Sequence, residues 1–135
     1  REVLALYSRV YGANSAAAAV AHNTLGGLFN SLGRAELALP HMQAEYDILR
    51  DSRGPAHRDT VRAAQNLAVV IDNAYGPSGG EQAEELFLGA IAEGARLYGS
   101  EHPSLVAFRS NYARFLLRRG RDQEALAVLV AVGME

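Results

Sequence analysis

The sequence predicts an all-α fold in which antiparallel helix pairs stack side by side into a solenoid. Three observations predict it. Glycine-led junctions recur along the chain, a similar core motif follows each junction in a helical stretch, and an alanine then recurs in register. The junctions begin at Gly12, Gly54 and Gly99, which lie 42 and 45 residues apart. Self-similarity at periods of roughly 20 to 50 residues is the signature of repeat architectures.

The helical stretches at 16–32, 58–74 and 104–119 carry this core motif. It reads Asn23-Thr24-Leu25-Gly26, then Gln65-Asn66-Leu67-Ala68, then Ser110-Asn111-Tyr112-Ala113. Thr24, Asn66 and Asn111 are spaced by 42 and 45 residues, whereas the aligned alanines Ala38, Ala83 and Ala125 are spaced by 45 and 42. A single insertion of three residues accounts for every spacing, and the breaker-rich segment 76–80 is the obvious place for it.

Local signals agree with these helix boundaries. Pro103 can occupy the first turn of a helix, because the proline nitrogen there needs no hydrogen bond. The junction glycines follow predicted helix ends, where a left-handed residue is least costly. We therefore divide the chain into 1–11, the second helix of a truncated preceding repeat, and three repeats at 12–53, 54–98 (with the insertion near 76–80) and 99–135. This division predicts about seven helices.

The motifs resemble those of a known repeat family. Gly99-Ser100-Glu101-His102-Pro103, Asn66-Leu67-Ala68 and Glu81-Gln82-Ala83-Glu84 match the junction, first-helix core and second-helix start of tetratricopeptide repeats of the kinesin-light-chain-like type, about 42 residues long. The chain departs from that pattern at Arg58, which replaces the junction proline, and at 12–15, which keeps only the glycine. The resemblance implies a right-handed α-solenoid that binds proteins, and it does not identify the partner.

In such a solenoid the first helices line a concave surface. Alignment to the family's turn glycine assigns the residues on that surface, and most of them are uncharged and polar. We expect partner contacts from Asn23, Thr24, Asn30, Arg62, Gln65, Asn66, Asn73, Asn111, Arg114 and Arg118. Amides can donate to and accept from an extended backbone, and arginine offers a planar fork to a carboxylate. The resemblance thus implies a protein or peptide ligand with acidic or C-terminal carboxylates.

Each of these assignments has a structural alternative. Arg62, Arg114 and Arg118 could form a solvated face paired with nearby acids, and Asn66 and Asn111 could serve only to cap or bridge helices. Asp72 opposes a simple carboxylate clamp, because its charge would repel an anionic ligand. Gly27 could leave a slot for a ligand side chain or could allow tight packing.

Composition and motifs argue against the other function classes. The net charge of −2 offers no basic field for nucleic acid, and the longest apolar run, 16–21, is too short to cross a bilayer. The chain has no cysteine, and its histidines (His22, His41, His57 and His102) have no ligands at metal-site spacing. We expect those histidines to be structural, with no catalytic residues, no metal and no cofactor.

Two alternatives to a binding module remain open. The apolar segment 128–132 and the half-repeat at 1–11 suggest a structural or self-association role through exposed end repeats, because terminal repeats normally need polar caps. The chain could also be a sensory segment of a larger multidomain regulatory protein. For this chain itself we expect a cytoplasmic scaffold rather than an enzyme.

Overall fold

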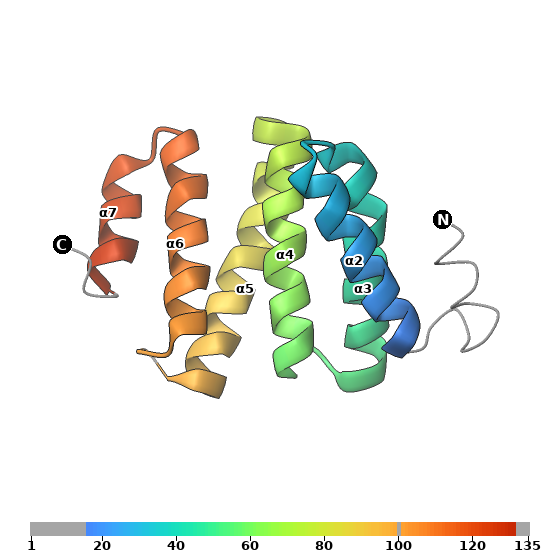
Figure 1. Ribbon diagram of the computed structural model, residues 1–135. Helices are drawn as coiled ribbons and strands as arrows, with labels where there is room; N and C mark the ends of the chain where they lie inside the picture. The colour runs from blue at the N-terminus through green and yellow to red at the C-terminus, as the bar shows by residue number, and fades with distance from the viewer. Residues whose placement is uncertain (1–15, 100, 132–135) are drawn as a thin grey trace.

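The computed structural model describes residues 16–99 and 101–131, and the prediction of an all-α fold is confirmed for this part of the chain (Figure 1). Its elements are α2 (Ala16–Ser31), α3 (Ala35–Arg53), α4 (Arg58–Tyr75), the 3-10 helix η1 (Gly76–Gly79), α5 (Gly80–Tyr98), α6 (Pro103–Arg118) and α7 (Asp122–Ala131). The described residues thus form six α-helices. The additional helix expected at 1–11 lies outside the described residues.

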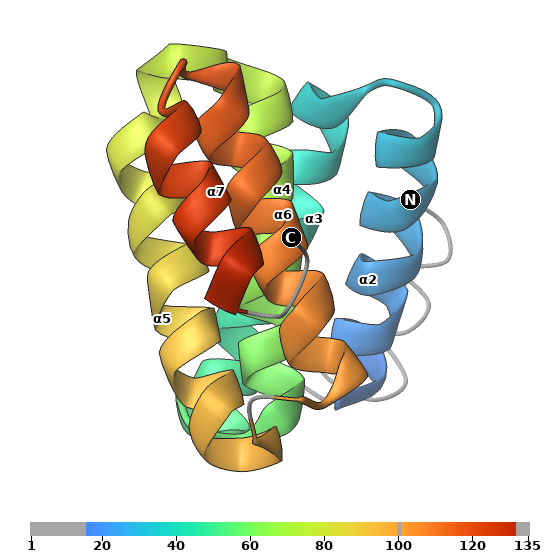
Figure 2. The same ribbon diagram turned by 90° about the vertical axis from the view of Figure 1, so that its left-hand side faces the viewer.

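The helices are arranged as consecutive antiparallel pairs. Each helix packs against the next one along the chain, and α4 also contacts α6 directly. Figure 1 shows the first helices α2 and α4 in front of α3 and α5, and Figure 2 shows the same stack from the α7 end. We refer to α2, α4 and α6 as the first helices and to α3, α5 and α7 as the second helices.

The two described junctions between pairs have nearly the same geometry. Gly54 and Gly99 have φ values of 87° and 86°, and each amide donates a hydrogen bond to the carbonyl four residues earlier. A positive φ is far easier for glycine than for any other residue. The chain then enters the next helix through His57 or His102, whose Nδ1 accepts from the backbone N–H two residues later, at 3.1 Å in both cases. These histidines are therefore N-caps.

The extra residues of the middle repeat do not form a long loop. Helix α4 has 18 residues, whereas its counterpart α6 has 16. The connection that follows α4 is the four-residue helix η1, whereas residues 119–121 connect α6 to α7. Most of the additional length therefore extends α4 by half a turn. Gly79 ends η1 against α4, and a Cβ there would lie 2.7 Å from the Ile71 side chain, so only glycine fits.

The described residues form three clusters of buried apolar side chains. The largest cluster of buried residues takes side chains from α3, α4, α5, α6 and α7, and Phe87 and Phe115 stand at its centre with ring centroids 5.2 Å apart. The aligned alanines Ala38, Ala83 and Ala125 are each at most 1% exposed, which is consistent with one shared packing position per pair. The repeat boundaries at 12–53, 54–98 and 99–135 stay a prediction.

Candidate functional site

The residues predicted to contact a partner all lie on the first helices. Asn23, Thr24 and Asn30 belong to α2; Arg62, Gln65, Asn66 and Asn73 to α4; Asn111, Arg114 and Arg118 to α6. Their surroundings differ, however, and only some of them have hydrogen-bonding groups left for a ligand.

A ladder of side chains crosses the three first helices. Asn73 Nδ2 on α4 donates to Asn30 Oδ1 on α2 at 3.3 Å, and Arg118 Nη1 on α6 donates to Asn73 Oδ1 at 3.0 Å. Three predicted contact residues from three different helices therefore lie side by side. The ladder ties the helices together and gives their shared face a polar edge.

Asp72 is neutralised rather than repulsive. Its carboxylate accepts from Arg118 Nη1 at 2.9 Å and from Arg119 Nη1 at 2.7 Å. Arg119 is held further by a 2.7 Å bond from its Nη2 to the Gly76 carbonyl and by stacking over the Phe115 ring at 3.9 Å. Two guanidinium groups on one buried carboxylate leave a net positive charge, which removes the objection that Asp72 would repel an anion.

A pocket of about 130 Å³ opens beside this cluster, between α4 and α6. Its lining combines the core rings Phe87 and Phe115 with mostly polar side chains. It is lined by Val69, Asp72, Asn73, Phe87, Asn111, Arg114, Phe115 and Arg118. Four of these eight residues (Asn73, Asn111, Arg114 and Arg118) are predicted partner contacts, and Asn73 and Arg118, which meet here, lie 45 positions apart in the sequence. We call this feature the α4–α6 pocket.

Arg114 is the cation that gives this pocket its electrostatic character. Its one hydrogen bond within the described residues runs from Nη1 to Asn111 Oδ1, at 3.1 Å, and no carboxylate of that part of the chain pairs with it. Helix α6 carries three arginines and no acidic residue. Counting Arg119, the pocket has three guanidinium groups beside one carboxylate, a net charge of +2.

Two amides near the pocket have unused hydrogen-bonding capacity. Asn66 is half-buried and makes no side-chain hydrogen bond with the described residues. Gln65 is 3% exposed, and neither its Nε2 nor its Oε1 has a partner there. Gln65 lies two helical turns before Asp72, and so on the flank of α4 that faces α6. The Gln65 amide atoms are too buried for a ligand on the surface to reach, so Asn66 is the accessible amide of the two.

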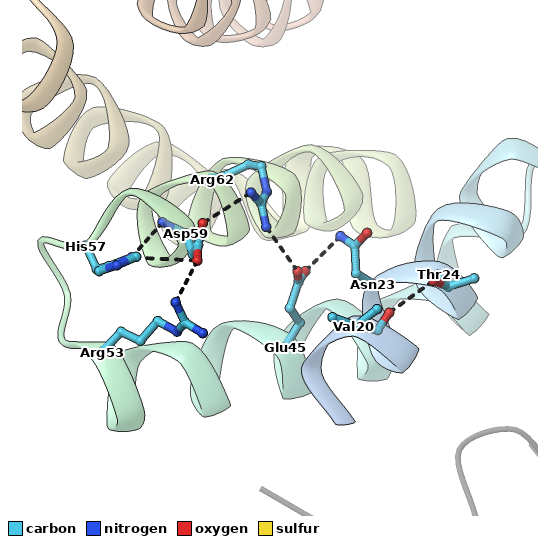
Figure 3. Close-up of polar contacts among 8 residues, drawn as sticks. All are labelled: Val20, Asn23, Thr24, Glu45, Arg53, His57, Asp59 and Arg62. Carbon is cyan, nitrogen blue, oxygen red and sulfur yellow. Dashed lines mark hydrogen bonds and ion pairs between the residues drawn. The ribbon is translucent and has the colours of Figure 1, made fainter. Parts of the chain in front are cut away.

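Asn23 and Arg62 are engaged elsewhere, with a buried carboxylate on α3 (Figure 3). Asn23 Nδ2 donates to Glu45 Oε1 at 3.1 Å, and Arg62 lies 4.0 Å from Glu45 Oε2 and 3.4 Å from Asp59 Oδ1. Burial raises the pKa of Glu45, and the hydrogen bond from Asn23 and the positive charge of Arg62 oppose that rise. Arg62 thus matches the alternative reading of an arginine paired with nearby acids.

The remaining predicted contact on α2 is also satisfied locally. Thr24 Oγ1 donates to the Val20 carbonyl at 3.0 Å within its own helix (Figure 3).

Sequence reasoning missed both Glu45 and Arg119. Glu45 aligns with Ala90 and Arg119 with Ala74, so no repeated polar position marked either one. The free groups therefore concentrate on α4 and α6 rather than along all three first helices.

The histidines do not form a metal site within the described residues. His57 and His102 are the helix caps, and His22 Nδ1 lies 3.0 Å from His41 Nδ1. Burial, and then the neighbouring His41, lower the pKa of His22. No group of three or more potential ligands (His, Cys, Asp or Glu) stands close enough to hold a metal ion in the part of the chain that is described.

Known structures share the whole architecture. BtubC (BKLC) from P. vanneervenii superposes with a TM-score of 0.82 at 19% identity, over 96% of this chain and 51% of its own. A protein from Podosopora anserina, assigned as a kinesin light chain with nearly identical TPR-like repeats, gives 0.83 at 21% identity, over 97% and 61%. A point variant of that same protein gives 0.83 at 21% identity, over 97% and 60%.

The fold is a tetratricopeptide-like array of the kinesin light chain type. The chain spans about half to three fifths of the length of these structures. No family model matches the sequence, and a search among curated proteins finds no match. Among the described helices of this tetratricopeptide-like array, none has the length and apolar character needed to span a membrane.

Proposed function

We propose that this tetratricopeptide-like array is a protein-interaction module that binds an extended segment of its partner across α4 and α6, with a carboxylate of that segment at Arg114. The carboxylate belongs to an acidic side chain or to a C-terminus. The observation that carries the proposal is the α4–α6 pocket, which combines amides that have free donors with a cation that pairs with no acidic group of the described residues.

The neighbouring residues support the same ligand. Arg118 and Arg119 outweigh Asp72 in charge, so the pocket attracts an anion. Among the described residues, the amide of Asn111 keeps its donor free, and the half-buried Asn66 offers a donor and an acceptor on α4. Such amides suit the main chain of an extended peptide, whose N–H and C=O groups alternate.

A peptide-binding measurement tests the proposal. Two fluorescent peptides are compared that share an acidic sequence and differ only at the last residue, which carries a free carboxylate or an amide. A charge-assisted hydrogen bond contributes about 1.5–3 kcal/mol, so Arg114→Ala should weaken binding of the free-acid peptide about tenfold or more. Arg114→Lys should restore part of it, because lysine keeps the charge without the bidentate fork.

The control variant is Arg96→Ala, which removes one positive charge from the second helix α5. Arg96 is exposed and pairs with Glu93 at 2.6 Å. Arg96→Ala should leave peptide binding unchanged apart from a small general effect of the lost charge. Equal losses from Arg96→Ala and Arg114→Ala would show that only net charge matters and would refute the pocket.

Self-association is a second candidate function, favoured by one observation. Leu126 and Val130 lie one turn apart on α7 and are 54% and 46% exposed. Light scattering across concentration tests it, with Leu126→Glu as the disrupting variant. A monomer at every concentration, in both the original chain and the variant, would remove this candidate.

A further inference from the structure

A second pocket is lined mainly by α5, with further residues from α3, α4 and the junction between them. Its volume is about 260 Å³, below the ~300–1,000 Å³ of typical small-molecule sites, so it suits a single bulky side chain. It is lined by Tyr46, Pro55, Val61, Ala64, Glu85, Leu86, Gly89, Ala90, Ala92 and Glu93. Most of these residues are apolar, and the two glutamates are the acidic groups among them. We call it the α3–α5 pocket.

Gly89 keeps this pocket open at a cost to its helix. A glycine inside a helix destabilises it relative to alanine, so its presence needs a reason. Gly94, one and a half turns later, has a packing reason, because a Cβ there would lie 3.2–3.3 Å from Phe108 and Leu105. A Cβ at Gly89 would meet nothing within 4 Å. Packing therefore does not require Gly89, and the absence of a side chain at this lining position leaves room in the pocket.

The charge of the second helices indicates what would enter. Helix α5 carries four glutamates and one arginine, a net charge of −3, and α3 carries four acidic residues and two arginines, a net charge of −2. Helix α7 adds −2, whereas α2 and α4 are neutral and α6 carries +3. The two sides of the stack thus have opposite charge, and the side with the α3–α5 pocket is acidic.

At the pocket itself the balance is also negative. Glu85 is exposed and has no ion pair with the described residues, and Glu93 pairs only with Arg96 of its own helix. Arg50 lies 5.4 Å from the Tyr46 ring centroid, but it is already paired with Asp47 and Asp51. An apolar side chain flanked by positive charges complements these features.

We propose that the α3–α5 pocket is a second docking surface, which takes one bulky apolar side chain from a basic segment of a protein partner. Its negative charge is opposite in sign to the charge of the α4–α6 pocket, so the two surfaces select different partners or different segments of one partner. The inference stands independently of the proposed function, because it shares no residue with that site.

Three synthetic peptides of equal length test it on the full ¹⁵N-labelled chain. The first has a central phenylalanine flanked by lysines, the second has the same centre flanked by glutamates, and the third has lysines around a central serine. The first peptide should shift the backbone amide signals of Gly89 and Ala92 in a saturable way and should bind more weakly as salt is raised. The other two should produce little or no shift there.

Gly89→Leu is the blocking variant, and the chain offers a matched control. Leucine at 89 fills the pocket and replaces a helical glycine at a position with room for a side chain, so the variant should fold at least as stably. The control is Gly27→Leu, the same change at a helical glycine of α2 where an added Cβ also meets no atom of the described residues within 4 Å. Gly89→Leu should weaken binding of the first peptide about tenfold or more, the effect of losing one anchor side chain. Gly27→Leu should leave it unchanged.

Glu85→Gln tests the charge requirement without filling the pocket. It should weaken the first peptide and make its binding less sensitive to salt. Several outcomes would overturn the inference: no saturable shift at Gly89 and Ala92, equal binding of the serine or glutamate peptide, or full binding by Gly89→Leu.

Discussion

Arg119 should contribute far more to stability than its neighbour Arg118, although both donate to the same carboxylate. The side chain of Arg119 is 14% exposed, and besides Asp72 it contacts the Gly76 carbonyl and the Phe115 ring. The side chain of Arg118 is 49% exposed, and its other contact is the exposed side chain of Asn73. Replacement of each arginine by alanine therefore compares a buried anchor with a surface ion pair.

The magnitudes follow from these contacts. Removing one partner of a buried ion pair costs about 3–5 kcal/mol, but Asp72 keeps Arg118, which puts the ionic loss well below that range. The lost bond to the Gly76 carbonyl adds about 1.5–3 kcal/mol, and the lost contact with Phe115 adds about 0.5–2 kcal/mol. These contributions overlap, so we expect about 3 kcal/mol for Arg119→Ala. Solvent screening limits Arg118→Ala to about 1 kcal/mol or less.

Urea denaturation followed by circular dichroism at 222 nm, the helical signal, measures both variants against the original chain at neutral pH. The test is the difference between the two variants in the free energy of unfolding, because each variant loses the same formal charge. Equal losses, or a loss below about 1 kcal/mol for Arg119→Ala, would refute the view that Arg119 anchors the end of α4 to α6.

Two further predictions concern the fold. Gly79→Ala should lower the free energy of unfolding by about 1–3 kcal/mol, because the new Cβ would overlap the Ile71 side chain at 2.7 Å. Gly89→Ala should raise the free energy of unfolding by about 0.5–1 kcal/mol, because alanine favours the helix and has room there. Equal effects of the two substitutions in thermal denaturation would contradict both predictions. Because the pKa of His22 is lowered in the folded chain, the unfolded chain binds a proton at this residue more tightly. The contribution of neutral His22 to the free energy of unfolding is therefore complete above pH 6.5 and is lost as the pH falls below 6.5 and through the lower pKa of the folded chain. The unfolding free energy should therefore fall more between pH 7.5 and 5.5 in the original chain than in His22→Gln, and parallel pH profiles would contradict this.

Repeated positions explain how much of the fold the sequence could predict. The junction histidines, the glycines before them and the buried alanines each recur in register, so one copy supports the reading of the next. Pro103 likewise begins α6, as its fixed φ and missing N–H allow. The inserted residues were harder to interpret, because glycine and proline signal a break without showing that α4 first continues for half a turn.

The candidate site was predictable in its position but not in its pairing. Helical register places Asn73, Asn111 and Arg114 on one face, and the α4–α6 pocket does bring them together. Which arginine meets which acid depends on side-chain geometry across helices, as Glu45 shows: it reaches Arg62 and Asn23 from α3, and its aligned residue in the next repeat is an alanine. Contacts that occur in one repeat only leave no periodic trace in the sequence.

The central claim is that a partner carboxylate lies at Arg114, between α4 and α6. The most direct measurement follows the side-chain amide signals of Asn73 and Asn111 by NMR while the free-acid peptide is added. We predict saturable shifts of both signals, together with α4 and α6 backbone amides, and their loss in Arg114→Ala. Shifts confined to α3 and α5, or unchanged shifts in Arg114→Ala, would contradict the claim.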